Sequence, residues 1–243
     1  MSFVQNLSPV KQAAKALGID IRSRRHLFES RFVQHTNRLK LDLIVDVGAN
    51  KGQFAESILG AGYKGVIISF EPQPDACEIL IEKAKRWGDR WIIAPPMAIA
   101  EKNGTTEFTC FSANAMSSLL EPVSGIEGIV PHATVEKTIT VKLEKLEDIL
   151  WDIANISPQP FALKIDTQGS ELRVLQGAEK LFQYSRLVQF ESSLKPIYQD
   201  QPSYFELDLY MRNNEFTIVD LEPGYRHNES GVLIEYDVIY ETI

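Results

Sequence analysis

The stretch LIVDVGANKGQFAES, residues 43–57, contains the features that decide the fold. An apolar run of strand length ends at Asp46, and the chain then turns through Gly48, Asn50 and Gly52 before an amphipathic segment begins. A glycine-containing turn between a strand and a helix is typical of nucleotide sites, because backbone amides at the helix N-terminus can face the ligand. The stretch therefore predicts a strand, a ligand-binding turn and a helix in that order.

The spacing of the glycines argues against a dinucleotide ligand. A dinucleotide fingerprint places its glycines as G-x-G-x-x-G, so that the backbone can approach a pyrophosphate. Counted from Gly48, the second and third positions are Asn50 and Gln53, and the remaining pattern is D-x-G-x-x-x-G. Such a turn fits S-adenosylmethionine, whose ammonium can bind a carboxylate and whose carboxylate can bind amides at a helix N-terminus.

A second acid follows the next apolar run. Glu71 stands 25 residues after Asp46 and directly follows the run VIISF at 66–70. Because parallel strands end at the same edge of a sheet, a carboxylate there can accept hydrogen bonds from both ribose hydroxyls of a nucleoside. A glycine turn after a strand and an acid before a proline can each be purely structural. Found together and in this order, they favour a nucleoside-type cofactor.

Beyond this motif, apolar runs of strand length alternate with amphipathic segments, as in βαβ units that build a parallel sheet. We predict an α/β, Rossmann-like domain at residues 41–243, preceded by a helical extension at residues 1–40 with helices at 9–17 and 22–38. The expected strands lie at 41–47, 66–70, 91–94, 161–166, 186–192, 216–223 and 232–240. The expected helices of the domain lie at 53–59, 74–87, 170–182 and 203–212.

The segment between residues 105 and 143 departs from this rhythm. Runs at 105–112 and 137–143 have the alternating pattern of half-exposed strands, and they flank a long loop at 112–136. Loops of this length inside a compact domain are usually functional or mobile. We therefore expect the loop to contribute to the site.

Several further motifs extend the pattern from about residue 43 to residue 240. They are DVGANKGQFA (46–55), ISFEPQPDAC (68–77), MAIAEKNGTTEF (97–108), SSL (117–119), LKIDTQGSELRVLQGA (163–178), ESS (191–193) and the closing YDVIY. Together they resemble the FkbM family of S-adenosylmethionine-dependent O-methyltransferases. The first motif alone would indicate only the wider class I methyltransferase superfamily, whereas the F-E-P step and the K-I-D-x-x-G-x-E-x-x-V-L-x-G-A pattern point to this family.

The resemblance implies a seven-stranded, mostly parallel sheet with an antiparallel last strand, and S-adenosylmethionine as the cofactor. It also implies which residues contact that cofactor, namely Asp46, Gly48, Asn50, Gly52 and Glu71, with Met97 and Ala98 beside the adenine.

One motif departs from the most common family pattern. Many members have D-V-E-G where this chain has Asp166, Thr167, Gln168 and Gly169. The substitution removes one charge near the reacting centre, so a metal ion is less expected there and we assign no metal ligands.

Methyl transfer to a hydroxyl requires a group that orients the acceptor and takes its proton. Asp166 stands where the run FALKID ends, on the sheet edge of Asp46, and is our first candidate for the general base. Its structural alternative is a cap on the helix that begins near Ser170. Glu191, at the end of the next strand, is the second candidate for base or substrate contact.

Four other polar residues near these motifs carry weaker hypotheses. Ser117 and Ser118 in the long loop are candidates for binding acceptor hydroxyls, although ordinary loop polarity explains them equally well. His132 is favoured as a solvated loop residue over a base. Glu171 is expected to stabilise the first turn of its helix.

Composition and charge exclude several other classes of protein. The chain has 243 residues, is 44% hydrophobic and carries a net charge of −8. Residues 1–40 hold eight Lys and Arg against two acids, a net +6, which leaves −14 for the rest. An acidic body argues against nucleic acid as a partner. The basic arm could contact an anionic substrate, a membrane surface or the acidic body, and docking on its own domain is the favoured interpretation.

No apolar run approaches the roughly 18 residues of a membrane span, and the first residues lack the pattern of a secretory signal, so we expect a cytoplasmic protein. Cys77 and Cys110 are too few for a disulfide framework and are expected to be buried. We predict an O-methyltransferase that acts on a hydroxyl of a sugar, glycan or glycosylated metabolite. The alternatives are a nicotinamide-dependent oxidoreductase, disfavoured by the missing glycines, and a non-catalytic scaffold that keeps the cofactor site.

Overall fold

The structure, a computed structural model, describes residues 13–14, 16–17, 27–112, 116–126, 134–227 and 229–243. Its central feature is a seven-stranded sheet with the strand order β3-β2-β1-β7-β8-β10-β9. Neighbouring strands from β3 to β8 are parallel, whereas β10 runs antiparallel to both β8 and β9. The predicted α/β fold, with a mostly parallel sheet and an antiparallel last strand, is therefore confirmed.

The strands of this sheet lie close to the expected positions. β1 and β7, at the centre, are buried along their whole length, as expected for strands that are covered on both faces. The strand bounds are β1 Leu43–Val47, β2 Val66–Phe70, β3 Trp91–Ile93, β7 Phe161–Ile165, β8 Ser185–Ser193, β9 Phe216–Pro223 and β10 Glu235–Thr242.

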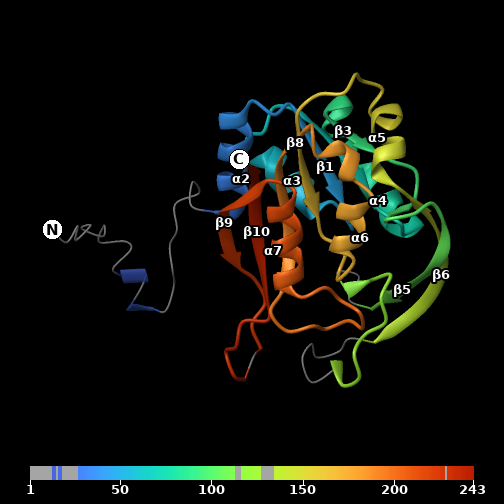
Figure 1. The fold of residues 1–243 in the computed structure, drawn as a ribbon, viewed down its shortest axis with the longest axis vertical. Coiled ribbons are helices and arrows are strands. Elements are labelled where there is room, and N and C mark those ends of the chain that lie inside the picture. The colour runs from blue at the N-terminus through green and yellow to red at the C-terminus, as the bar shows by residue number, and fades with distance from the viewer. Residues whose placement is uncertain (1–12, 15, 18–26, 113–115, 127–133, 228) are drawn as a thin grey trace.

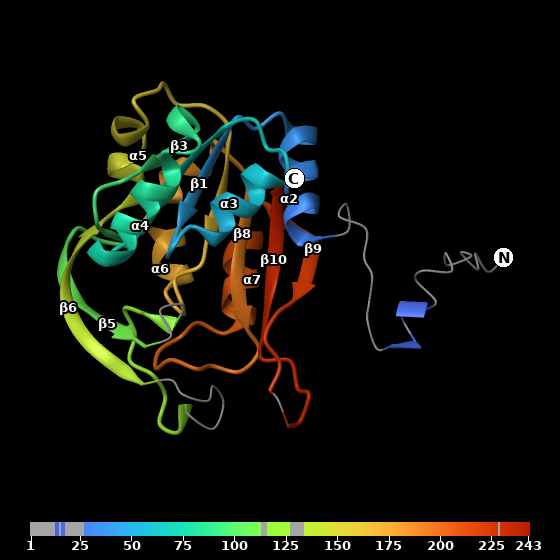
Figure 2. The ribbon, with the colours of Figure 1, turned by 180° about the vertical axis from the view of Figure 1, so that it is seen from behind.

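Helices cover the two faces of the sheet, as Figures 1 and 2 show from opposite sides. One face is covered by α2 (Phe28–Leu39), α3 (Gln53–Gly60) and α4 (Pro74–Ala84). The other face is covered by α5 (Leu146–Ala154), α6 (Glu171–Gln176) and α7 (Tyr204–Asn213). Both faces of the sheet are thus buried, and the ends of the strands are left for the site.

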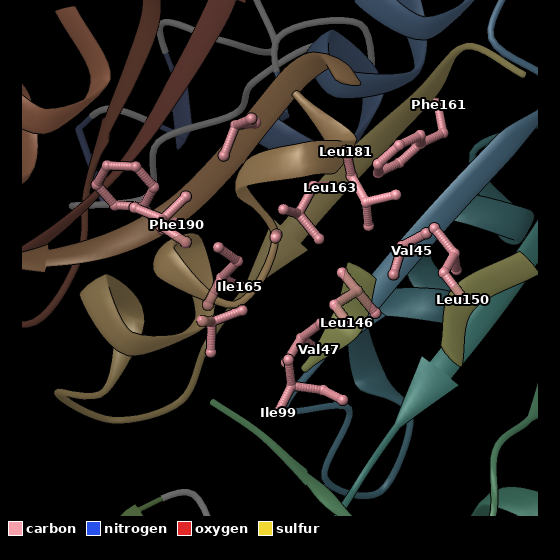
Figure 3. Close-up of a cluster of buried hydrophobic side chains, with 14 of the residues drawn as sticks. Val45, Val47, Ile99, Leu146, Leu150, Phe161, Leu163, Ile165, Leu181 and Phe190 are labelled. Atoms are coloured by element: carbon pink, nitrogen blue, oxygen red, sulfur yellow. The ribbon is translucent and has the colours of Figure 1, made fainter. Parts of the chain in front are cut away.

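Alternate residues of the central strands form the core on the side of α5 and α6. Val45 and Val47 of β1 and Leu163 of β7 are buried against Leu146 and Leu150 of α5 (Figure 3). The residues between them in β1 and β7 point to the opposite face, where they meet α2 and α3. Polar residues at these alternate positions, such as Asp46 and Lys164, are therefore directed toward the α2 and α3 side.

Two expected helices differ in extent from the observed ones. α2 begins at Phe28 because Leu27 is extended, with φ −71° and ψ 145°, so the helix that we expected from residue 22 begins later in the chain. The expected helix at 170–182 is broken at Gly177 into α6 and a 3-10 turn. A Cβ at Gly177 would lie 2.0 Å from the Ala100 carbonyl oxygen, so the helix ends where it meets that backbone.

The remaining helices include one that the sequence analysis missed. α5 has Leu146, Leu150 and Ala154 at helical spacing and buries all three. α7 opens with the expected capping box, in which Ser203 accepts a hydrogen bond from the Glu206 amide and the Glu206 carboxylate accepts one from the Ser203 amide. Of the expected helix at 9–17, the structure describes residues 13–14 and 16–17, of which 13, 14 and 16 are helical, and the other positions lie outside the described residues.

A second, three-stranded sheet stands beside the carboxyl end of the main sheet. It contains β4 (Ala98–Ile99), β5 (Gly104–Phe111) and β6 (Val135–Glu144) in the order β4-β6-β5, and the long β5–β6 pair is antiparallel. Figure 2 shows β5 and β6 curving past α4. The two half-exposed strands expected here are confirmed, and Ser118 of the loop between them pairs with Thr109 of β5.

The α2 helix is fixed to the last two strands by ion pairs. Arg31 lies 2.7 Å from Asp220 and 2.8 Å from Glu222 of β9, and Arg38 pairs with Glu241 of β10. This part of the basic arm thus docks on the acidic body, while Arg22, Arg24 and Arg25 lie outside the described residues. Within the described chain, none of the helices is long and apolar enough to cross a membrane.

Candidate functional site

A cavity of about 220 Å³ opens at the carboxyl ends of β1, β2, β7 and β8. Five of the residues predicted to bind cofactor line it, and so do both candidate bases. The lining consists of Val47, Gly48, Asn50, Phe70, Glu71, Pro72, Gln73, Met97, Ala98, Ile99, Phe108, Ser117, Leu119, Asp166, Thr167, Gln168 and Glu191.

The two glycines of the turn after β1 serve different purposes. Gly48 has φ 76°, and a Cβ there would lie 1.8 Å from the Asp166 carbonyl oxygen, so glycine lets the turn approach the end of β7. Gly52 has φ 84°, and a Cβ there would lie 2.5 Å from the ring of Trp91. Gly48 lines the cavity, whereas Gly52 packs against Trp91 at the start of α3, so the cofactor contact expected from Gly52 stays a prediction.

Glu71 lies at the end of β2 with its carboxylate tied to two backbone amides. The Asn50 amide donates to Oε2 at 2.8 Å, and the Gln73 amide donates to Oε1 at 2.9 Å. Burial raises the pKa of Glu71 to about 6, and these hydrogen bonds partly oppose the shift. Each carboxylate oxygen retains a lone pair, so Glu71 can still accept hydrogen bonds from a ligand in the cavity.

Asn50 contributes a side-chain oxygen to the same cavity wall. Its backbone is left-handed, with φ 48°, which turns the amide toward Glu71. Its Oδ1 is buried and has no hydrogen-bond partner in the part of the chain that the structure describes. Because a buried acceptor without a partner costs free energy, this atom is suited to a donor on a ligand.

The part of the cavity wall that lies beside Glu71 is apolar. Met97 and Ala98 line the cavity together with Phe70, Ile99 and Phe108, and Met97 is held by a hydrogen bond from its amide to the Glu71 carbonyl oxygen at 3.3 Å. An apolar slot next to a hydroxyl-binding carboxylate matches a nucleoside, which has a flat base beside a ribose.

Asp46 is buried beneath the turn and does not line the cavity. Its Oδ1 lies 2.9 Å from the Lys164 ammonium, and its Oδ2 accepts a hydrogen bond from Ser69 at 3.0 Å. The side chain is fully buried because it points to the α2 and α3 side of the sheet. The direct cofactor contact that we expected from Asp46 therefore stays a prediction. Asp46 supports the turn from below.

Asp166 and Glu191, the two candidate bases, are joined by one amide group. Gln168 Nε2 donates to Asp166 Oδ1 at 3.0 Å and to Glu191 Oε2 at 3.0 Å. Burial, followed by the charge of Asp166, raises the pKa of Glu191 well above its usual value. The Asp166 side chain is 44% exposed and lies 3.8 Å from the Lys164 ammonium. The two carboxyl groups thus have different surroundings at one edge of the cavity.

Asp166 does not cap the helix that follows it. The N-cap of α6 is Ser170, and no side chain makes a capping hydrogen bond there. Glu171 instead organises the turn before the helix, because its Oε1 accepts hydrogen bonds from the amides of Thr167 and Gly169 at 3.0 and 3.1 Å. Burial raises the pKa of Glu171 to about 7. Glu171 was expected to stabilise the first turn of α6, and in the structure it stabilises the loop that precedes this helix.

The two serines of the long loop are both engaged by the protein. Ser117 lines the cavity, and its hydroxyl accepts a hydrogen bond from the Phe111 amide at 3.1 Å. Ser118 is fully buried, does not line the cavity, and donates to the Gln168 carbonyl oxygen at 2.6 Å. Ser118 therefore fastens the loop to the turn of Gln168. His132 lies outside the described residues.

Sequence reasoning gave no site role to Lys164 and did not foresee the bridging role of Gln168. Lys164 alternates with Asp166 on the same strand face, which is a signal that it could lie beneath the site. Gln168 occupies the position where family members more often have glutamate, but only the fold reveals that its amide reaches Glu191 from the neighbouring strand. Among the described residues, no group of three or more His, Cys, Asp or Glu side chains is arranged to hold a metal ion.

The strand order and the cavity at the carboxyl ends of β1 and β2 define a class I methyltransferase fold. Three solved structures were found at low sequence identity, and the two with TM-scores of 0.50 or more show likeness of fold. The O-methyltransferase from Bacillus cereus in complex with SAH has a TM-score of 0.51 and 11% identity, covering 99% of this chain and 93% of that one. A protein from Listeria monocytogenes serotype 4b has a TM-score of 0.50 and 9% identity, covering 92% and 69%. An rRNA methylase from Streptococcus thermophilus has a TM-score of 0.48 and 12% identity, covering 92% and 98%.

A match to the methyltransferase FkbM domain spans residues 46–218. The chain belongs to the FkbM methyltransferase family, and it is an S-adenosylmethionine-dependent methyltransferase. Among curated proteins, no relative matches the chain significantly.

Proposed function

We propose that this methyltransferase transfers the methyl group of S-adenosylmethionine to a hydroxyl of a sugar, a glycan or a glycosylated metabolite. The proposal that the acceptor atom is oxygen rests on one observation. Asp166 and Glu191 stand side by side at the edge of the cofactor cavity, bridged by Gln168, where a hydroxyl has to lose its proton.

The cavity residues fit the cofactor in a definite direction. In this proposal Glu71 accepts hydrogen bonds from the ribose hydroxyls, and Met97 and Ala98 lie along the adenine. The methionine end lies toward Gly48 and Asn50, whose orphaned Oδ1 accepts a hydrogen bond from a ligand donor. This direction leaves the sulfonium end near Asp166.

The chain's own groups then supply positioning and proton transfer. When bound, S-adenosylmethionine supplies an electrophilic methyl group, whose bond to sulfur breaks as the bond to the acceptor oxygen forms. Asp166 orients the hydroxyl and accepts its proton, since it is the more exposed of the two carboxylates. Gln168 holds the Asp166 carboxylate in place through its amide. Glu191 is the alternative base.

The charge of the site favours a neutral acceptor over a nucleic acid. Three carboxyl groups lie at the carboxyl ends of β7 and β8, namely those of Asp166, Glu171 and Glu191. The chain as a whole carries a net charge of −8. A polyanion would require basic contacts to its phosphates, which the charge of Asp166 and the net charge of the chain oppose. A hydroxyl-rich neutral molecule meets no such penalty and can donate hydrogen bonds to these carboxyl groups.

Two measurements test this function. Calorimetric titration should detect binding of S-adenosylhomocysteine and no binding of NAD, because the turn lacks the spacing for a pyrophosphate. Incubation with tritiated S-adenosylmethionine and cell fractions should label glycan or glycosylated-metabolite fractions, with the label in methyl ethers that resist alkaline hydrolysis. Label in alkali-labile esters would contradict a hydroxyl acceptor, and label in protein or RNA alone would contradict a sugar, glycan or glycosylated metabolite as the acceptor.

A further inference from the structure

A second cavity lies on the other side of Asp166 from the cofactor cavity. It has a volume of about 210 Å³ and is bordered by α2, α3, the carboxyl end of β7, the middle of β8 and the amino end of β10. Among the described residues, Asp166 is the one that lines both cavities. A group held in the second cavity would therefore reach the carboxylate that faces the cofactor cavity.

The second cavity contains a buried acceptor that lacks a donor. Gln189 of β8 is 5% exposed and lines the cavity. Its Nε2 donates to Asp237 Oδ1 at 3.2 Å, whereas its Oε1 has no hydrogen-bond partner among the described residues. Buried amide oxygens are almost always paired, so this atom points to a ligand that brings a donor.

Acceptors outnumber donors among the other polar groups of this cavity, where Gln53 and Ser57 bring groups that both donate and accept. Glu29, Asp166 and Asp237 bring carboxyl groups to its lining. The cationic side chain there, Lys164, is already bonded to Asp46 at 2.9 Å and to the Gly48 carbonyl oxygen at 3.1 Å. The cavity thus presents an excess of acceptors, which matches a molecule with several hydroxyl donors and disfavours one with phosphate or carboxylate groups.

Aromatic side chains complete the wall next to these acceptors. Phe28 of α2 and Phe54 of α3 both line the cavity. The Phe54 ring is held in place by an edge contact with Phe32 at 5.5 Å and by the Lys164 ammonium at 5.2 Å. Apolar rings beside converging hydrogen-bond acceptors suit a ring that has carbon–hydrogen faces and hydroxyl edges.

We infer that the second cavity binds the acceptor, and that the part bound there is a single uncharged sugar ring. This inference rests on the proposed function. The cavity is about as large as the cofactor cavity and is open to the surface, so a sugar ring can bind there while the rest of a glycan extends outward. In the transfer the acceptor oxygen forms its bond to the methyl carbon, the carbon–sulfur bond breaks with its electron pair on sulfur, and the hydroxyl proton passes to Asp166.

Two walls of the cavity come from segments outside the family match. The match covers residues 46–218, whereas Phe28 and Glu29 belong to α2 and Asp237 belongs to β10. The ion pairs of Arg31 with Asp220 and Glu222 hold the first turns of α2 against this edge. α2 and β10 therefore add to the acceptor cavity three residues that the match does not cover, while α3, β7 and β8 supply the others.

A bulky side chain at Ser57 tests the location. Ser57 lies on the exposed side of α3 and lines the second cavity only, so Ser57→Trp should fill that cavity without disturbing the core. The matched control is Glu78→Trp, on the exposed side of α4, which lines neither cavity. Affinity for S-adenosylhomocysteine should stay within threefold of the wild-type value in both variants.

Binding of sugar probes is measured by saturation-transfer NMR on the full chain saturated with S-adenosylhomocysteine. The probes are the methyl glycosides of glucose, galactose, mannose and rhamnose, with phenol and a primary alkylamine as other acceptor classes. We expect at least one glycoside to give a signal in the wild-type protein and in Glu78→Trp. Affinity for it should fall at least tenfold in Ser57→Trp, and by about tenfold in Gln189→Leu, which removes the unpaired acceptor.

The outcomes separate this inference from the proposed function. Failure of the wild-type chain to bind S-adenosylhomocysteine defeats the proposed function, and the inference falls with it. Normal cofactor binding with equal glycoside signals in Ser57→Trp and Glu78→Trp overturns the location alone. If S-adenosylhomocysteine binds normally but only phenol or the amine gives a saturation-transfer signal, the ligand is not a sugar ring. The same conclusion follows if none of the probes gives a signal.

Discussion

Lys164 of β7 and Asp46 of β1 form a buried ion pair directly beneath the turn of the cofactor cavity. The Lys164 ammonium lies 2.9 Å from Asp46 Oδ1, and the two side chains are 6% and 0% exposed. The same ammonium donates to the carbonyl oxygen of Gly48 at 3.1 Å. Two adjacent strands and the turn between β1 and α3 are thereby tied together through one cation.

Removing one partner of this pair should destabilise the protein. Asp46→Ala leaves the Lys164 charge buried without its counter-ion, and breaking a buried pair in this way typically costs about 3–5 kcal/mol. Urea unfolding followed by circular dichroism measures the loss. The double variant Asp46→Leu, Lys164→Met should lose less than Asp46→Ala, because no charge remains unpaired. A fully stable Asp46→Ala protein that no longer binds S-adenosylhomocysteine would establish Asp46 as a direct ligand.

Cofactor affinity should depend on pH through Glu71. Burial raises the pKa of Glu71 to about 6, and only the ionised carboxylate can accept hydrogen bonds from both ribose hydroxyls through its two oxygens. Affinity for S-adenosylhomocysteine should therefore weaken as pH falls below about 6. Glu71→Gln should bind about tenfold more weakly at pH 8 and lose this part of the pH dependence. Identical pH profiles for both proteins would remove Glu71 from the ribose site.

The bridging amide of Gln168 should matter for turnover and not for cofactor binding. Gln168→Leu removes the donor shared by Asp166 and Glu191, so Asp166 is no longer held in the orientation that receives a proton. We expect kcat to fall by about tenfold or more, while affinity for S-adenosylhomocysteine changes less than threefold. Gln168→Asn, which keeps a shorter amide, serves as the comparison. Unchanged turnover in Gln168→Leu would show that the bridge is dispensable.

The buried carboxyl groups should make the free protein more stable in mild acid. Burial raises the pKa of Glu171 and Glu235 to about 7 and that of Asp237 to about 6. The native state then holds protons that the unfolded chain releases between about pH 4.5 and 7, so the free energy of unfolding falls as pH rises through this window. We expect the protein to be several kcal/mol more stable at pH 5.5 than at pH 8, since one pKa unit corresponds to about 1.4 kcal/mol and each of the three groups contributes.

Thermal and urea unfolding at both pH values measure this difference. Glu171→Gln removes one of the shifted groups and should reduce the difference. A protein that is equally stable at pH 5.5 and pH 8, or more stable at pH 8, would contradict the account of these carboxyl groups.

Local patterns in the sequence were enough to predict most of the fold. The apolar runs that became β1, β2, β7, β8 and β9 are strands buried on one or both faces, and such runs identify themselves without tertiary information. The early end of α6 could not be foreseen, because Gly177 ends the helix through contact with the Ala100 backbone, which is distant in sequence. The start of α2 is likewise not marked by a capping side chain.

The sequence located the site but not the partners of its residues. The ends of β1, β2, β7 and β8 were predicted to carry the functional side chains, and Glu71, Asn50, Asp166 and Glu191 do line one cavity. Asp46 was assigned to the ligand because its motif position resembles a ligand position. Its actual partner, Lys164, is set by the register that places Asp46 opposite Lys164 on the neighbouring strand. The register between two strands that lie far apart in the sequence cannot be predicted from the sequence of either strand alone.

The central claim is that Asp166 accepts a proton from an acceptor hydroxyl during methyl transfer. The most direct test measures turnover and S-adenosylhomocysteine affinity of Asp166→Asn beside those of Glu191→Gln, with the acceptor fraction that the wild-type protein labels. Asparagine matches aspartate in shape but cannot take the proton, so turnover should fall by a factor of about 10² to 10⁴. Affinity for S-adenosylhomocysteine should stay within a few fold. Near-normal turnover in Asp166→Asn would contradict the claim, and a large loss in Glu191→Gln alone would assign the base to Glu191.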